Sequence, residues 1–148
     1  MVKEDVAYAT CKEEVENILA DFRNRDIPVA VINEHLQGDL VKFYGVHGTD
    51  FFYWFYPSPC SHSKFGLEKI NGIAKGIPFS VEELKIQSDK AAEALNVPIY
   101  GGDCVVSADG TLRIIDFNDW PSFARCREEA GGKIAECIYN RAKKQMKQ

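Results

Sequence analysis

The pair Asp109-Gly110 is the feature that most constrains the fold of this chain, because it lies between two short apolar runs. Residues 105–107 and 112–115 have the composition of β-strands. An Asp-Gly pair in this setting favours a two-residue type I′ turn, in which both central positions need a positive φ. The sequence therefore predicts an antiparallel hairpin in which Ala108 faces Thr111.

Counting outward from that turn brings three oxygen-bearing side chains to one face of the hairpin. Asp103 would lie opposite Asp116, and Asn118 would point the same way because alternate residues of a strand share a face. Like charges directly opposite each other destabilise a sheet. The neighbours expected on this face are apolar, which adds a desolvation cost: Val105, Leu112 and Ile114. Mg²⁺ would offset the charge, since it prefers oxygen ligands and typically takes one or two carboxylates. The sequence thus predicts a metal site at Asp103, Asp116 and Asn118.

This prediction depends on the type of turn. A three-residue loop with a bulge would change the pairing and move Asp103 off the shared face. The three polar residues would then simply flank the turn.

The remaining pattern predicts an α+β fold, with an antiparallel sheet flanked by helices, rather than βαβ winding. Capping boxes, Thr10 with Glu13 and Ser80 with Glu83, begin two helices, and the second ends near Leu95. Short strands are expected at residues 6–9 and 29–32, longer ones at 40–46 and 51–56, and a final helix at 123–144. Residues 57–78 are rich in Gly and Pro and predict an irregular segment with at most a short helix at 67–70.

Length and composition exclude several classes of protein. A chain of 148 residues predicts a single domain. The 18 Lys and Arg residues against 22 Asp and Glu give a net charge of −4, which does not favour nucleic-acid binding. Five cysteines without a C-x-x-C pair predict reduced thiols in the cytoplasm. The sequence shows no signal peptide and no apolar segment that would span a membrane.

Two motifs resemble the ATP-grasp superfamily. Residues 31–42, Val-Ile-Asn-Glu-His-Leu-Gln-Gly-Asp-Leu-Val-Lys, are similar to the adenine hinge of that family. Asp103 followed by residues 116–121, Asp-Phe-Asn-Asp-Trp-Pro, is similar to its Asp and Glu-x-Asn-x-x-Pro magnesium motif. Three residues depart from the family pattern: Asp116 replaces the commoner Glu, Asn33 the frequent Gln, and Ser122 the usual Gly.

The resemblance implies a partial ATP-grasp fold that binds ATP and Mg²⁺. It would comprise a lid-like subdomain over about residues 1–57 and a metal-binding subdomain over about 79–148. Backbone groups of Glu34 and Leu36 would bind adenine, and Asp39 the ribose hydroxyls. Lys42 would contact a phosphate or the substrate as the candidate catalytic residue. These residues also have non-functional interpretations. Glu34 and Asp39 could belong to a polar loop, and Lys42 could be an edge-strand lysine that deters aggregation.

The function implied is the ATP- and Mg²⁺-binding part of a ligase. Such enzymes activate a carboxylate as an acyl phosphate, which an amine then attacks. The family's N-terminal domain and the lysine-bearing lid strand have no counterpart here, so the partners expected are a nucleotide, an unknown small-molecule substrate, and either a missing N-terminal half or a second copy docked on the aromatic run 51–56. The alternatives are a non-catalytic nucleotide-binding or interaction module, or a fragment of a small-molecule kinase.

Overall fold

The computed structural model describes residues 5–57 and 72–147, which fall into two compact units. Residues 5–35 form the first unit, around helix α1 (Lys12–Asn24). The second unit begins at residue 36 and contains a four-stranded sheet with two helices. The predicted short helix at 67–70 lies outside the described residues.

Helix α1 begins one residue later than its capping box predicts. Cys11 is the N-cap, and the Thr10 backbone N–H and hydroxyl both donate to Glu14 Oε2, at 2.6 and 2.9 Å. Glu14 therefore takes the part predicted for Glu13. It stands three residues after the N-cap, from where a carboxylate can reach back to free backbone donors.

The strands predicted at residues 6–9 and 29–32 are wrong, since neither segment has regular secondary structure. Val29, Val31 and Ile32 are exposed, at 77, 82 and 66 %. A strand forms only where a neighbouring backbone completes its hydrogen bonds. Among residues 5–35 no strand is present to do so, and the apolar composition of 29–32 alone does not create one.

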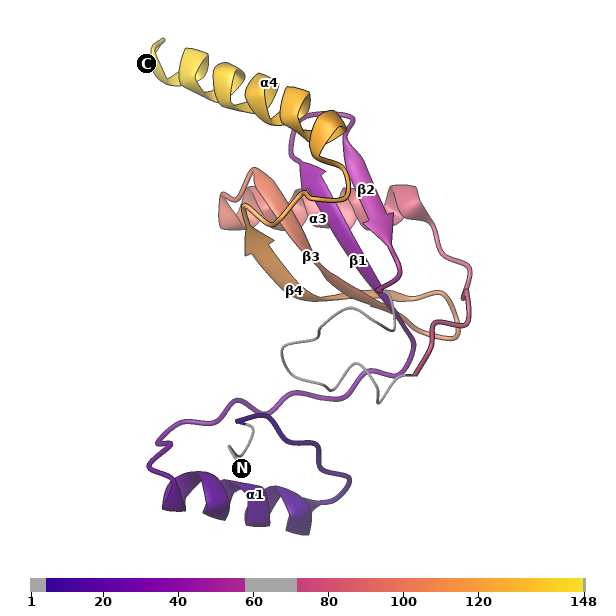
Figure 1. Cartoon of the computed structure of the whole chain (residues 1–148), viewed down its shortest axis with the longest axis vertical. Coiled ribbons are helices and arrows are strands. Elements are labelled where there is room, and N and C mark those ends of the chain that lie inside the picture. Colours follow the sequence, from indigo (N-terminus) through magenta and orange to yellow (C-terminus); the bar gives the residue numbers. More distant parts are fainter. Residues whose placement is uncertain (1–4, 58–71, 148) are drawn as a thin grey trace. The chain divides into compact units, whose positions relative to one another are not determined.

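The second unit confirms the predicted α+β fold. Strands β1 (Asp39–Val46), β2 (Phe52–Phe55), β3 (Ile99–Val106) and β4 (Leu112–Asp119) form one sheet in the order β2-β1-β3-β4, with every pairing antiparallel. Helix α3 (Val81–Leu95) crosses one face of this sheet, and α4 (Arg127–Gln145) follows β4 (Figure 1). Strands from both predicted subdomains therefore share one sheet.

The β3–β4 hairpin has a three-residue loop instead of the predicted type I′ turn. Ser107 pairs with Thr111, whose carbonyl oxygen accepts the Ser107 N–H at 3.0 Å. The Gly110 N–H donates to the Ser107 carbonyl at 2.8 Å, and only Gly110 within the loop has a positive φ, of 82°. Asp109 keeps a negative φ and instead accepts the Thr111 N–H. This geometry is a type I turn closed by a left-handed glycine.

A β-bulge then restores the predicted pairing of the two carboxylates. Cys104 pairs with Ile114 and Asp103 with Asp116, so Ile115 is an extra residue in β4 with no partner on β3. The three-residue loop moves the register by one residue and the bulge moves it back. Asp103 and Asp116 are therefore opposite each other, as expected. Leu112 and Ile114, however, point to the α3 face and not to the face of the carboxylates, because they lie before the bulge.

The α3 face of the sheet holds the main core. Leu84 and Ala92 of α3 pack on fully buried side chains that include Phe43 and Tyr100. The predicted cap of α3 is confirmed, since Ser80 Oγ accepts the Glu83 N–H at 3.1 Å. Burial also raises the pKa of the Cys104 thiol in this core to about 11, so the thiol stays protonated at neutral pH.

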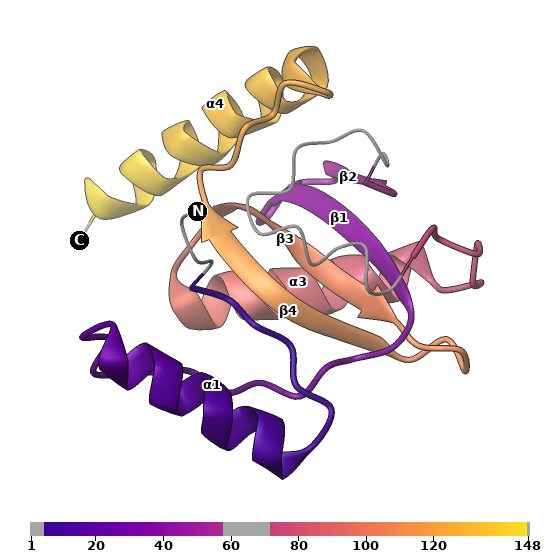
Figure 2. The same cartoon turned by 60° about the horizontal axis from the view of Figure 1, so that its bottom comes forward.

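Helix α4 packs on the opposite face, which we call the site face (Figures 1 and 2). Its buried residues Cys126, Ala130 and Cys137 form a second cluster with residues from the ends of the strands, including Val46 and Ile99. Among the described residues, α4 packs on this end of the site face. The other end carries the polar side chains considered below.

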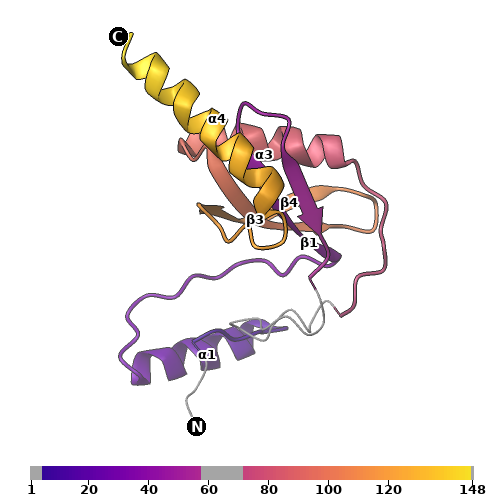
Figure 3. The ribbon, with the colours of Figure 1, turned by 45° about the horizontal axis from the view of Figure 1, so that its top comes forward.

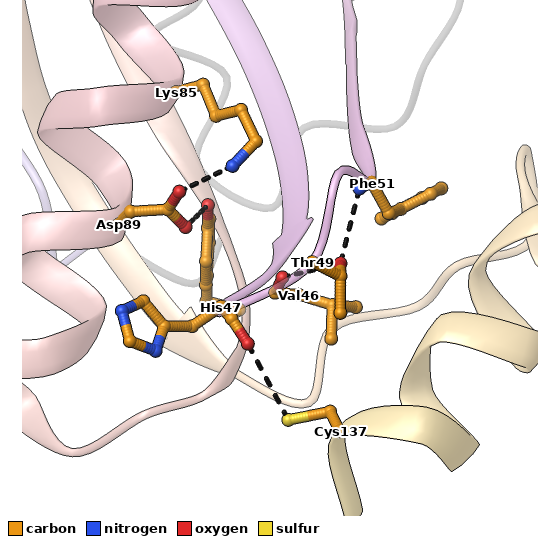
Figure 4. A network of polar contacts seen from close by, with 8 residues as sticks. Val46, His47, Thr49, Phe51, Lys85, Asp89 and Cys137 are labelled. Carbon is orange, nitrogen blue, oxygen red and sulfur yellow. Dashed lines mark hydrogen bonds and ion pairs between the residues drawn. The ribbon is translucent and has the colours of Figure 1, made fainter. Parts of the chain in front are cut away.

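The turn between β1 and β2 contacts α4 (Figure 4). Cys137 of α4 donates from its thiol to the His47 carbonyl at 3.8 Å, and Thr49 bonds the Val46 carbonyl at 2.8 Å. On the α3 side, the buried Tyr100 hydroxyl donates to Asp89 Oδ1 at 2.8 Å. Burial and this bond raise the pKa of Tyr100.

The final helix begins at Arg127 and not at Phe123 as predicted, because the intervening residues pack on the sheet. We call residues 120–126 the strap (Figure 3). It starts at Trp120, which has a positive φ of 43° and an indole that is 60 % exposed. Alternate strap residues then face successive strands. Pro121 approaches Gly101 of β3, and the ring centroids of Phe123 and Tyr44 of β1 are 5.4 Å apart. The guanidinium carbon of Arg125 lies 4.3 Å from the ring centroid of Phe55 of β2.

No helix among the described residues combines the length and apolar character needed to cross a membrane.

Replacing Gly101 by Ala should destabilise the protein. A Cβ at residue 101 would lie 2.7 Å from both Pro121 Cγ and Tyr44 Cδ1, so the strap would have to move away from β3. Overpacking of this kind costs about 1–3 kcal/mol, which urea unfolding would measure. The matched control is Gly132→Ala in α4, where an added Cβ meets nothing within 4 Å. That change should stabilise the helix by roughly 0.5–1 kcal/mol. Equal effects at the two positions would contradict the packing of the strap.

Candidate functional site

Four side chains form a row across the site face, one from each strand. Lys42 of β1 is the Cα partner of Phe55 on β2 and of Asp103 on β3, and Asp103 is the partner of Asp116 on β4. Cross-strand partners point to the same face, so the four side chains are neighbours. We call this the central row: Phe55, Lys42, Asp103 and Asp116.

Asn118 lies in the next row toward α4. It pairs with Gly101 of β3, which pairs in turn with Tyr44 of β1. Asn118 Nδ2 donates to Asp116 Oδ2 at 2.5 Å, so the two side chains are in contact along β4. The three residues predicted to hold a metal therefore lie together on one face, as predicted.

An ion pair already offsets the charge of Asp103. Lys42 Nζ lies 3.1 Å from Asp103 Oδ1 and 3.0 Å from Oδ2, and the two side chains are 27 and 24 % exposed. The sequence argument assigned this charge compensation to a metal ion. In the structure, the Lys42 ammonium group compensates the charge instead. Lys42 belongs to β1, and the register of the β3–β4 hairpin does not predict that β1 lies beside β3.

The donor set suits a hard cation that keeps further ligands of its own. Two carboxylates and one carboxamide are oxygen ligands of the kind that Mg²⁺ takes, with water and phosphate oxygens completing its shell. Asp116 and Asn118 are exposed, which leaves room for those additional ligands. Within the described part of the chain, no group of three or more His, Cys, Asp or Glu side chains could hold a metal ion.

Asp39 has a structural contact that the hinge motif does not reveal. Its side chain is 3 % exposed, and its two carboxylate oxygens accept the backbone N–H groups of Lys75 and Ile77, each at 2.8 Å. Burial alone would raise the pKa of Asp39, but these bonds, with the Gly76 N–H and the Lys75 charge, lower it below its usual value. The carboxylate thus holds residues 75–77 against the start of β1. Its assignment to ribose stays a prediction.

The other two predicted nucleotide contacts lie on either side of the boundary between the units. Glu34 is exposed and belongs to the first unit, whereas Leu36 is half-buried and belongs to the second. Their backbone roles toward adenine stay predictions.

Sequence reasoning did not show that the aromatic rings of the site face contact a cation. Tyr44, Tyr53 and Phe55 form mutual ring contacts at 5.7–6.4 Å between centroids, and Arg125 stacks on Phe55. A strand was expected at the aromatic run 51–56, but Arg125 is about seventy residues away from Phe55 in the sequence. Only the strap brings the two together.

No protein-family model matches this chain, and neither curated proteins nor solved structures show a significant similarity to it.

Replacing Lys42 by Met should make the carboxylate pair depend on a metal ion. The variant leaves Asp103 opposite Asp116 without the ammonium group, which should lower stability at neutral pH by about 1 kcal/mol. Added Mg²⁺ should then raise the Tm of Lys42→Met more than that of the unchanged protein, because the ion no longer competes with Lys42. Thermal unfolding with and without Mg²⁺ measures this. Equal Tm shifts in the two proteins would show that Lys42 and the metal ion do not compete for the same position.

The low pKa of Asp39 predicts a pH-dependent effect of Asp39→Asn. A carboxylate with a folded pKa below its unfolded value stabilises the protein above the unfolded pKa, and this stabilisation is lost as the pH falls through the folded value. The variant should therefore be less stable by about 1–3 kcal/mol at neutral pH, since an amide cannot accept both N–H bonds. The difference should shrink as the pH falls below about 4. Urea unfolding over a pH series tests this, and a difference that stays constant would contradict the structural role of Asp39.

Proposed function

We propose that the site face binds a nucleotide together with Mg²⁺. The observation that carries this proposal is the direct pairing of Asp103 with Asp116, with Asn118 on the adjoining row and the Lys42 ammonium beside them. A pair of facing carboxylates, one of them partly buried and next to a lysine, is suited to a ligand that combines a cation with phosphate oxygens. No Ser/His/Asp arrangement is needed for this chemistry.

Each side chain has a definite part in such a site. Asp103, Asp116 and Asn118 would hold Mg²⁺ by their oxygens, and the bound ion would offset the charge of the phosphates. Lys42 would leave Asp103 when the cation arrives and turn its ammonium toward a phosphate oxygen. The adenine and ribose contacts expected from the hinge motif, at Glu34, Leu36 and Asp39, are not part of this site, because Asp39 pairs with Val106 of the α3 core and so lies on the other face of the sheet.

The reaction proposed is that of an ATP-grasp ligase. A carboxylate of the substrate would attack the γ-phosphorus of ATP and form an acyl phosphate with release of ADP, and an amine would then attack the acyl carbon and displace phosphate. The chain's own residues would contribute position and charge: Lys42 orients the transferred group, and the central row keeps the reactants on one face of the sheet. This assignment rests on the two ATP-grasp-like motifs and on the pairing of Asp103 with Asp116 beside Asn118. A partner that carries the family's N-terminal half would complete the enzyme.

An interaction module is the second candidate function, and one observation favours it. Val29, Val31 and Ile32 form an exposed apolar run in the first unit. Contiguous exposed apolar surface is typical of a site that a partner covers. In this case the nucleotide site would be ancestral, and binding of ATP would be absent.

Calorimetric titration of Mg²⁺ and ATP distinguishes the two candidates. We expect saturable binding to the unchanged chain that requires Mg²⁺, and at least about a tenfold loss of affinity in the Asp103→Asn, Asp116→Asn double variant. The matched control is Asp119→Asn, on the same strand but on the opposite face by strand alternation, because its partner Tyr100 is in the α3 core.

Two results would contradict the proposal. One is the absence of binding to a chain whose fold is confirmed by circular dichroism. The other is an equal loss of affinity in Asp119→Asn and in the double variant, which would show that the effect does not come from the site face.

A further inference from the structure

Arg125 lies at one end of the central row. Its guanidinium carbon lies 4.3 Å above the centroid of the Phe55 ring, which is the geometry of a stacked cation–π contact. The Phe55 ring is itself packed against Tyr44 and Tyr53, at 5.7 and 5.9 Å between centroids. The aromatic rings therefore provide a rigid base on which the guanidinium rests.

This stacking leaves the donors of Arg125 available. No hydrogen bond or ion pair joins Arg125 to any of the residues that the structure describes, and its side chain is exposed. A guanidinium has five N–H donors in its plane, and stacking on a ring uses none of them. A planar donor fork held in place by an aromatic ring is suited to a carboxylate or phosphate group, which accepts two parallel N–H bonds.

The position of Arg125 relative to the carboxylate pair sets a length. Phe55, Lys42, Asp103 and Asp116 occupy successive strands, and neighbouring strands lie about 4.8 Å apart. Phe55 is therefore about 10 Å from Asp103 and about 14 Å from Asp116 along the row. A phosphate oxygen held at Asp116 would thus be three strand spacings from the strand that carries Phe55.

Tyr44 connects the two ends electrostatically. Desolvation is the main cause of the raised pKa of Tyr44, but the charges of Lys42, Arg125 and Asp103 all act on its hydroxyl. Tyr44 also lies between the two ends by geometry, because it is two residues from Lys42 on the same face of β1 and its ring centroid is 5.7 Å from that of Phe55. A ligand on this face would meet both ends together.

We propose that Arg125 and Phe55 form an oxyanion subsite on the site face, and that it binds the acceptor substrate of the reaction proposed above. The substrate is then a small molecule with a carboxylate or phosphate about 10 Å from the group that is phosphorylated. The anionic end docks on the Arg125 fork, and the reacting end reaches Lys42 and Asp103. The assignment to the acceptor rests on the proposed function, whereas the oxyanion subsite itself does not.

The test is an NMR titration that follows the Nε–Hε signal of Arg125, without nucleotide or Mg²⁺. The probes are inorganic phosphate and benzoate, which separate phosphate from carboxylate recognition. We expect a saturable shift with at least one probe in the unchanged chain. Arg125→Gln should weaken binding of that probe, followed through backbone signals of the strap, by about tenfold or more. Arg125→Lys should recover only part of it, because an ammonium lacks the planar fork.

The matched control is Arg127→Gln, two residues further along at the start of α4. It removes the same charge without touching the stack on Phe55, and should leave probe binding unchanged. An equal loss in Arg127→Gln and Arg125→Gln would overturn the subsite, since it would show only a general effect of charge. Shifts that do not saturate in the unchanged chain would overturn it as well.

The Asp103→Asn, Asp116→Asn variant separates this proposal from the nucleotide site. It should still bind the anionic probe, because Arg125 and Phe55 are untouched. Probe binding without any binding of Mg²⁺ and ATP to the unchanged chain would keep the oxyanion subsite and overturn its assignment to an acceptor substrate. Loss of probe binding in the double variant would place the anion at the carboxylate end and overturn the subsite at Arg125.

Discussion

Ile115 has no partner on β3, and this bulge determines which side of the sheet the β4 carboxylates occupy. Side chains alternate along a strand, so one extra residue exchanges the two faces for everything beyond it. Before the bulge, Leu112 and Ile114 face the α3 core, and after it Asp116 and Asn118 face the other way. Without the bulge the three-residue loop would have put Asp116 out of register with Asp103.

The central row shows how a folded chain tolerates a like-charged pair. Asp103 is three-quarters buried and faces Asp116, and Lys42 compensates by contacting both of its oxygens. An ammonium group and a metal ion are alternative solutions to the same electrostatic cost. In the proposed site, the ligand's cation would therefore take the place of the lysine at this pair. The strap adds a second cation, Arg125, at the far end of the row.

Much of the second unit could be predicted from local patterns. Alternation and turn signals predicted the strands on either side of residue 47, and capping residues predicted the Ser80 cap. These signals act over a few residues, and together they indicated the α+β class. The first unit shows the limit of such patterns, because residues 29–32 have strand composition but lack a neighbouring strand. The start of the last helix was misplaced for a similar reason: Phe123 and Arg125 pack on rings of β1 and β2, contacts that sequence proximity does not reveal.

By itself, the sequence determined that Asp103, Asp116 and Asn118 are candidates for one site, since their spacing around a hairpin limits the possible registers. It reached the right pairing through the wrong turn, because two one-residue shifts cancel. Only the tertiary structure decided which groups surround that pair. Lys42 comes from a strand some sixty residues earlier, and Arg125 from a strap that crosses the sheet over Gly101. Local periodicity specifies the direction of a side chain, whereas its neighbours depend on long-range packing, which no short window of sequence contains.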